Sequence, residues 1–302
     1  LVGSEMCIRD SIKAVAIVGI GAVMPEAHSA PAFWENIKAK RYSIVDVPAD
    51  RWSAEMYYHA DPSVPDKTYS KIGSWVRDYP FEPLKWGILI PPSVLGNMDD
   101  SQKWSISASR EALLDYGYPD RPLNSERVAV IFGNSLAGEK HYRTNLRIHI
   151  PQFTKALGEL DAFQTLSPQV QQALLSGLED TIRSRTPEIN EDTMPGELAN
   201  IIAGRVANVF NFSGANFVTD AACASSLAAF QAAMDGLLSR QFDAVLTGGV
   251  DRNNGAASFV KFAKIGALSP DGSRPYAEGA NGFVMGEGAA VFLLTVSYTH
   301  LR

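Results

Sequence analysis

Short runs of apolar, β-branched residues alternate with helical patterns along almost the whole chain. Five runs bounded by glycine or polar residues are predicted to be buried strands, and they span 14–20, 128–132, 216–219, 244–247 and 289–294. Residues repeating with helical spacing lie between them, at 32–39, 102–116, 168–184, 198–209 and 222–239. This strand–helix–strand order predicts an α/β fold, in which helices cover the faces of a sheet.

The composition is that of a globular protein and argues against several classes of function. With 302 residues, of which 46% are hydrophobic, the chain can bury a sizeable core, although its length leaves one or two domains open. A net charge of −6 without a run of Lys or Arg argues against nucleic acid or an anionic membrane as the main partner. The longest apolar run, 14–24, is far shorter than the roughly 20 residues that span a bilayer. We therefore expect a soluble, cytoplasmic protein.

Metal and disulfide chemistry find little support in the sequence. The five histidines are not clustered, which argues against a zinc site. Cys7 and Cys223 are the only cysteines, and one pair in a chain of this length is not a disulfide framework. Each cysteine must therefore be judged as a thiol.

The two ends of the chain differ from the body between them. Residues 1–11 (LVGSEMCIRDS) and 296–302 (VSYTHLR) show no periodicity, and both resemble translated sequencing-adapter read-through. We therefore predict non-native tails at these positions around one native segment, 12–295, and assign no function to Cys7 or His300. Frayed native termini are the alternative.

The chemistry of the chain is predicted to lie at Cys223. Segment 218–227 reads VTDAACASSL, which puts this residue where a predicted strand ends and a helix begins. The positive end of a helix dipole favours a thiolate at such a position. Ala222 and Ala224 leave room for a bulky group to reach the sulfur, and Asp220 is expected to support the turn rather than to act as a base. A lone cysteine is more commonly a small buried hydrophobe, so position and spacing alone leave both interpretations open.

The sequence DAACASS at 220–226 is similar to the active-site motif of the β-ketoacyl synthases, the condensing enzymes of fatty-acid and polyketide assembly. Other motifs of this family match across 12–295; they are VAIVGIG at 15–21, VPADRW at 47–52, LSPDG at 268–272, RPY at 274–276 and GFVMGEG at 282–288. The AACA form, with MPGE at 194–197, looks most like synthase domains of large polyketide or polyunsaturated-fatty-acid assembly lines.

This resemblance implies a thiolase-like, layered αβαβα fold, of which the chain would be the N-terminal half, and a homodimer in the complete protein. It implies that Cys223 takes an acyl group from the phosphopantetheine of an acyl carrier protein. A malonyl-type extender then loses carbon dioxide and attacks the thioester. The Cys223 backbone N–H is a candidate oxyanion donor. Phe259 and Phe262 fall where the family lines its acyl pocket, although core packing explains them equally well. Neither a metal nor a bound cofactor is implied.

The catalytic machinery of the family is incomplete in this sequence. Its decarboxylation step uses two histidines and a lysine downstream of the glycine-rich segment, and no His occurs between His149 and His300. We therefore expect a truncated chain that cannot catalyse condensation alone. A non-catalytic structural or chain-length subunit is one alternative, against which the intact Cys223 counts. A serine hydrolase is another, because GNSLA at 133–137 half matches a serine elbow around Ser135.

Three further segments have simple structural explanations. The segment Gly19-Ile20-Gly21 follows a strand but lacks the third glycine of a dinucleotide site, so we expect a tight turn where the strand ends. Asp99 and Asp100 precede a predicted helix, and we expect them to cap it rather than to bind a metal. Residues 48–92 are rich in proline, aspartate and aromatic residues, and we expect a long ordered excursion rather than a linker.

Overall fold

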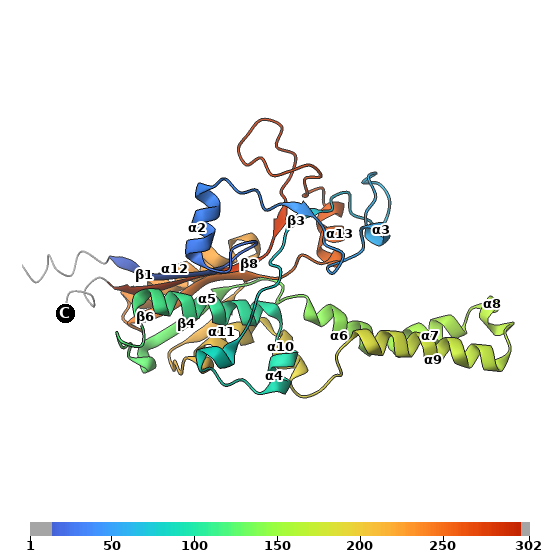
Figure 1. The fold of residues 1–302 in the computed structure, drawn as a ribbon, viewed down its shortest axis with the longest axis horizontal. Coiled ribbons are helices and arrows are strands. Elements are labelled where there is room, and N and C mark those ends of the chain that lie inside the picture. The colour runs from blue at the N-terminus through green and yellow to red at the C-terminus, as the bar shows by residue number, and fades with distance from the viewer. Residues whose placement is uncertain (1–13, 297–302) are drawn as a thin grey trace, which may run out of the picture.

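The computed structural model describes residues 14–296, and a five-stranded mixed sheet forms the centre of this part of the chain (Figure 1). Its order is β1-β8-β6-β4-β5, and the strands span β1 Val15–Val23, β4 Val128–Gly133, β5 Asn216–Thr219, β6 Ala244–Asp251 and β8 Gly288–Val296. β4, β5 and β6 run parallel, whereas β8 pairs antiparallel with both β1 and β6. All five predicted strands are present, and the α/β prediction is confirmed.

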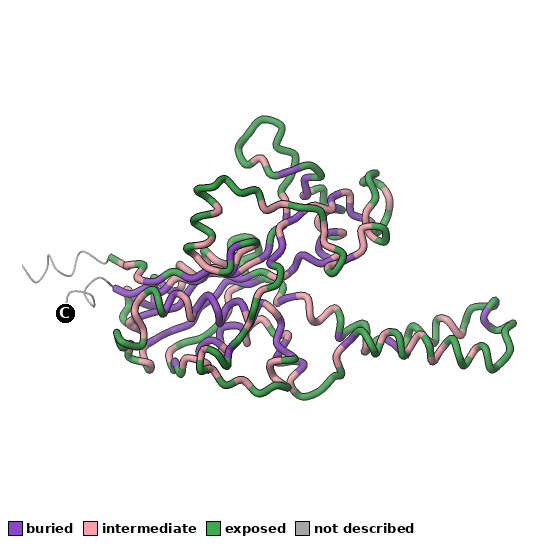
Figure 2. The backbone as a smooth tube through the Cα atoms, in the orientation of Figure 1, coloured by how far each residue is buried: buried purple, intermediate pink, exposed green. Residues whose placement is uncertain are grey.

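Helices cover both faces of this sheet. Side chains alternate along β4, so that Val130 joins one apolar core whereas Ala129 and Ile131 join another. The helices that complete these cores are α5 (Asp100–Tyr116) and α11 (Ala199–Val209) on the first side, and α12 (Ser225–Leu238) on the second. Figure 2 shows the buried backbone concentrated in these strands. The result is a three-layered α-β-α unit.

Helix α5 lies very close to β1, and two glycines permit this approach. A Cβ atom at Gly19 would lie 2.0 Å from the carbonyl oxygen of Ala112, and one at Gly21 would lie 2.0 Å from that of Ala108. Both glycines are inside β1, which continues to Val23. The predicted turn is therefore wrong, because the two glycines mark the face of a strand that meets a helix rather than the end of the strand.

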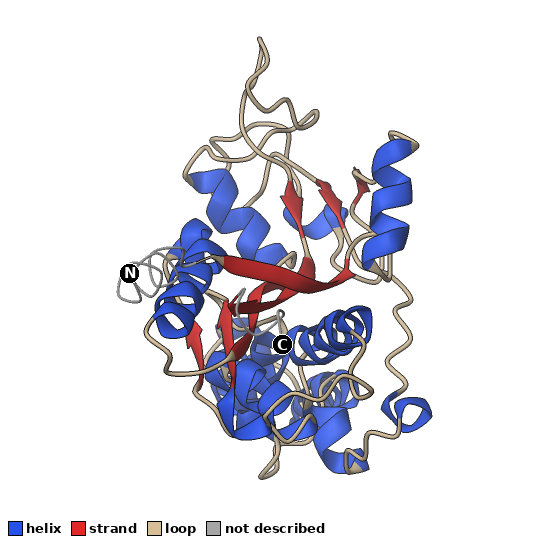
Figure 3. Ribbon diagram, turned by 90° about the vertical axis from the view of Figure 1, so that its left-hand side faces the viewer, coloured by secondary structure: helices blue, strands red, loops and turns tan. Residues whose placement is uncertain are grey.

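A smaller unit lies beside the main sheet. Within the described chain, its three strands are β2 Val45–Asp46, β3 Ile72–Ser74 and β7 Met285–Gly286, and its helices are α3 (Ala54–Tyr57) and α13 (Ala256–Lys264) (Figure 3). Trp52 and Trp75 are buried here with Phe259 in a separate apolar cluster. The proline- and aromatic-rich segment 48–92 is ordered, as predicted, because its tryptophans supply this cluster.

A helical arm projects from the body (Figure 1). It consists of α6 (Lys140–Ile148), α7 (Ile150–Gly158), α8 (Asp161–Gln164) and α9 (Pro168–Arg185). The Ser167 hydroxyl caps α9 by accepting the Val170 N–H at 3.4 Å, so the predicted start of this helix is confirmed. Figure 2 shows the arm largely exposed, and its helices α6 to α8 were not predicted.

The remaining elements connect these parts. They are α2 (Ala30–Lys38), α4 (Pro92–Asn97), α10 (Thr193–Glu197) and 3-10 turns at Pro83–Trp86, Ser125–Arg127 and Ala222–Ala224. Asp99 caps α5 by accepting the Ser101 N–H at 2.8 Å, as expected. Every helix within residues 14–296 is too short or too polar to cross a bilayer.

The last strand, β8, extends one residue beyond 295. β8 includes Val296, which the sequence analysis assigns to a tail, and this residue is buried and paired with Val15 of β1. The other predicted tail residues, 1–11 and 297–302, lie outside the described part of the chain.

Candidate active site

Three parallel strands, β4, β5 and β6, end at the same edge of the main sheet. The chain leaves them at Asn134, Asp220 and Arg252. Asn134 is buried, and its side-chain amide donates to the carbonyl oxygens of Val250 and Ala137 at 2.9 and 3.1 Å. This amide therefore fixes the loop after β4 to the end of β6. Open α/β sheets bind their ligands at such an edge.

The predicted turn around Cys223 is present at this edge. β5 ends at Thr219, Cys223 lies in the 3-10 turn Ala222–Ala224, and α12 follows directly. Ala222 has a φ of 49°, which is in the left-handed region. The carboxylate of Asp220 accepts the Ala222 N–H at 2.9 Å within the turn. The Cys223 side chain is exposed, which does not fit the alternative of a buried core cysteine.

The start of α12 lies directly against the ends of β4 and β6. A Cβ atom at Gly133 would come within 2.3 Å of the Ser225 carbonyl carbon, and one at Gly249 would come within 2.9 Å of the Ser226 Cβ. Glycine at these two strand positions allows the helix to approach so closely. The turn that carries Cys223 is consequently held between an edge strand and a helix fixed to the sheet.

The two phenylalanines proposed for the acyl pocket lie in α13, apart from this turn. Phe259 is fully buried, and its ring lies 5.0 Å from that of Trp52 and 6.2 Å from that of Trp75. Phe262 is partly buried and meets Phe283 edge-on at 5.5 Å. These contacts belong to the core of the smaller unit, so the geometry favours the packing interpretation for Phe259.

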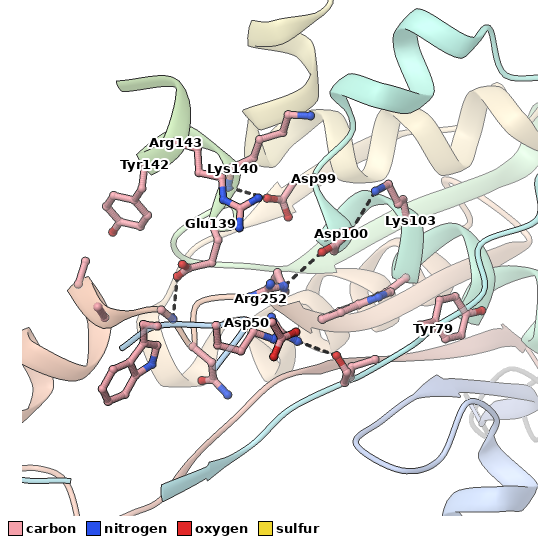
Figure 4. Close-up of a pocket in the computed structure, with 18 of the residues that line it drawn as sticks. Asp50, Tyr79, Asp99, Asp100, Lys103, Glu139, Lys140, Tyr142, Arg143 and Arg252 are labelled. Atoms are coloured by element: carbon pink, nitrogen blue, oxygen red, sulfur yellow. Dashed lines mark hydrogen bonds and ion pairs between the residues drawn. The ribbon is translucent and has the colours of Figure 1, made fainter. Parts of the chain in front are cut away.

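A polar cavity of about 1030 Å³ opens near the ends of β4 and β6 (Figure 4). Its walls come from segments 50–52, 76–79, 96–104, 139–146 and 252–257. Cys223, Phe259 and Phe262 do not line it, so this cavity is not the predicted acyl pocket.

Charges of both signs meet in this cavity. Figure 4 shows Asp100 between Lys103 and Arg252, with oxygen-to-nitrogen distances of 3.0 and 3.4 Å. Burial favours a higher pKa for Asp100, but the two cations more than offset it, and the pKa of this carboxyl is lowered. Glu139 accepts the Gly255 N–H at 3.0 Å, and burial raises its pKa. The cavity is thus lined by paired charges rather than by one sign.

A buried ion cluster beneath the cavity was missed by the sequence analysis. The Glu287 carboxylate is fully buried and pairs with Arg51 and, at 3.2 Å, with Arg252. It also accepts the Val76 N–H at 2.9 Å. Burial raises the pKa of Glu287 to about 7, against the opposing attraction of Arg252 and Arg51. The sequence offers one signal for this cluster, which is that Arg51 and Glu287 are charged residues within the motifs at 47–52 and 282–288.

The remaining candidates show no catalytic arrangement. Ser135 is exposed after β4, and no His within residues 14–296 forms a hydrogen bond with it. His141 packs against Tyr142, and the His149 ring contacts the Asn145 carbonyl oxygen at 2.7 Å. The described residues also contain no group of His, Cys, Asp and Glu that could hold a metal ion. A serine hydrolase is therefore not supported.

Comparison with known proteins agrees with the motif at the turn. Residues 13–300 match the family described as "Beta-ketoacyl synthase, N-terminal domain". The chain belongs to the β-ketoacyl synthase family. Its relatives include a component of the polyunsaturated fatty acid synthase of a Thraustochytrium species, which is 29% identical over 93% of this chain. A component of the phenolphthiocerol/phthiocerol polyketide synthase of Mycobacterium tuberculosis is 30% identical, also over 93%. The chain spans only 10% and 16% of the lengths of these two relatives.

Solved β-ketoacyl synthase structures resemble this one. An oxazolomycin ketosynthase domain of Streptomyces albus, OzmH KS7, superimposes with a TM-score of 0.73 at 25% identity, over 96% of this chain and 43% of its own. The ketosynthase from module 6 of the bacillaene synthase of Bacillus subtilis gives 0.70 at 26% identity, over 95% of this chain and 41% of its own. The predicted thiolase-like fold is confirmed.

Proposed function

We propose that this chain carries the nucleophile of a condensing acyltransferase, a 3-oxoacyl-[acyl carrier protein] synthase, and that Cys223 is that nucleophile. Its thiolate attacks the acyl thioester on the phosphopantetheine arm of an acyl carrier protein. A new carbon–sulfur bond forms at Cys223, the bond to the carrier breaks, and the carrier leaves as a thiolate that takes up a proton. The exposed cysteine at the strained turn between β5 and α12 carries this proposal.

The backbone of Cys223 supplies one oxyanion donor in this proposal. The N–H groups of Ala222 and Ala224 are bonded to the Asp220 carboxylate and the Ala221 carbonyl oxygen. Within the described chain, the Cys223 N–H between them donates to no acceptor. A free N–H beside the attacking sulfur is suited to the negative oxygen of the tetrahedral intermediate. The family resemblance implies a second donor from a later loop.

The condensation step completes the reaction. A malonyl-type extender on a second carrier loses carbon dioxide, its carbanion attacks the Cys223 thioester, a carbon–carbon bond forms, and Cys223 leaves as a thiolate. Since the family uses two downstream histidines for the decarboxylation, we assign to this chain the acyl transfer alone. The chain binds no cofactor of its own in this scheme, because the phosphopantetheine arrives on the carrier protein.

Self-acylation tests the proposal. The chain is incubated with a short acyl thioester of N-acetylcysteamine, and intact mass and peptide mapping locate the adduct. We expect one acyl group at Cys223, retained in Cys7→Ala and absent from Cys223→Ala. Iodoacetamide should label Cys223 much faster than Cys7, and a malonyl thioester should give no ketoacyl product. An adduct that persists in Cys223→Ala, or equally slow labelling of both cysteines, would contradict the proposal.

We further propose that the complete protein is a homodimer joined along β5. This strand lies at the edge of the main sheet and, in the described chain, pairs only with β4. Phe217 on β5 is 40% exposed, and Leu227 on the neighbouring α12 is 72% exposed. An open strand edge flanked by exposed apolar side chains is typical of a protein–protein interface.

A further inference from the structure

A buried serine lies beneath the turn that carries Cys223. Ser225 is the first residue of α12 and is 6% exposed. Its hydroxyl accepts the Ala221 N–H at 2.9 Å and donates to the Ala222 carbonyl oxygen at 2.6 Å. One hydroxyl group therefore binds both the Ala221 N–H and the Ala222 carbonyl oxygen, the groups at the two ends of the pair Ala221–Ala222.

The backbone at Ala222 needs such support. Its φ of 49° is unfavourable for a residue with a Cβ atom and persists only where the surroundings hold it. Asp220 and Thr219 also contribute, since the first accepts the Ala222 N–H and the second donates its hydroxyl to the Ser225 carbonyl oxygen at 3.0 Å. Ser225 differs from both because its side chain binds the backbone before and after the strained φ.

Ser225 is itself fixed to the sheet. Gly133 has no side chain, so the Ser225 backbone can lie against the end of β4. A Cβ atom at Gly133 would come within 2.3 Å of the Ser225 carbonyl carbon. The hydroxyl group is thus held relative to the sheet while it holds the turn. A turn released at Ala222 would move the sulfur and the free N–H of Cys223 together relative to the sheet.

We propose that Ser225 is a positioning residue for Cys223: its hydroxyl holds Ala222 in the left-handed conformation, and this fixes the sulfur and the backbone N–H of Cys223 in place at the edge of the sheet, where an acyl group would meet both. The inference rests on the proposed function of Cys223. It adds that the nucleophile is ordered by a neighbouring side chain that never touches the substrate.

Two readouts separate the inference from the proposed function. The first is the rate constant of iodoacetamide labelling at Cys223, relative to that at Cys7 in the same sample, which reports the order of the turn. The second is acyl transfer to Cys223 from the N-acetylcysteamine thioester. Ser225→Ala should lower both rates roughly tenfold, as expected when about two ordinary hydrogen bonds are removed. Ser225→Thr keeps the hydroxyl and should remain within about twofold of the wild type.

Two further variants make the test specific. Ser226→Ala removes the adjacent hydroxyl, for which no bond to a described residue is present, and should react like the wild type. Ala222→Gly combined with Ser225→Ala should recover much of the lost rate, because glycine adopts a positive φ without cost. Circular dichroism melts check that each variant is folded, and the double variant still reports if Ser225→Ala alone unfolds.

The outcomes are distinct. Wild-type labelling rates in a folded Ser225→Ala, or no recovery in the double variant, would overturn the positioning role. Slower labelling in Ser225→Ala and recovery in the double variant, together with a wild type that takes up no acyl group, would leave that role intact and refute the acyl-transfer proposal instead.

Discussion

Replacing Gly21 by alanine tests how closely α5 lies on β1. The new Cβ atom would lie 2.0 Å from the Ala108 carbonyl oxygen and 2.8 Å from the Ala112 nitrogen, whereas real Cβ atoms almost never approach within 3.0 Å. Both atoms are helix backbone, so α5 must move by about 1 Å as a unit. Overpacking of this kind costs about 3 kcal/mol at its upper end. At about 2 °C per kcal/mol for a domain of this size, we expect the melting temperature to fall by about 6 °C.

Gly177 provides a matched control with the opposite sign. It lies inside α9, and a Cβ atom there would meet no atom within 4 Å. Alanine is favoured over glycine in a helix by about 1 kcal/mol, so Gly177→Ala should raise the melting temperature by about 2 °C. Circular dichroism melts of both variants give the comparison. A Gly21→Ala protein that melts at or above the wild-type temperature would refute the close packing of α5 on β1.

Two further changes test the ion cluster and the dimer edge. Glu287→Gln should remove the pH dependence of stability that Glu287 gives the wild type, because the amide has the shape of the protonated carboxyl but cannot ionise. Since burial raises the pKa of Glu287 from 4.5 to about 7, the folded state retains a proton that the unfolded state has lost between these values. Wild-type stability in urea should therefore fall as the pH rises through this window, and an equal slope in Glu287→Gln would contradict the assignment. Phe217→Glu should convert a dimer to a monomer in light scattering, whereas Leu89→Glu, at an 86% exposed position outside β5 and α12, should not. A dimer that survives Phe217→Glu would exclude this edge.

The strands of the main sheet and the turn at Cys223 could be predicted because each of them is formed by consecutive residues with a recognisable pattern. The strand Asn216–Thr219 has the predicted bounds, and hydrogen bonds among residues 219–225 hold the turn at Cys223. Strands of two or three residues, such as Val45–Asp46, are too short to show a period, so the smaller sheet was not predicted. Gly19 and Gly21 were misread for a related reason, since a sequence shows a missing side chain but not the helix that occupies its place.

The ion cluster marks the limit of local reasoning more sharply. Arg51 and Glu287 are 236 residues apart in the chain and belong to two separate motifs, so no local pattern pairs them. Only the fold reveals that the small unit, the end of β6 and the start of β8 meet around one buried carboxylate. The cysteine turn, by contrast, depends on a serine two residues away and on an aspartate three residues away. This difference explains why the nucleophile can be recognised from a short motif. The residues that join the main sheet to the smaller unit around the Glu287 carboxylate cannot be recognised in this way.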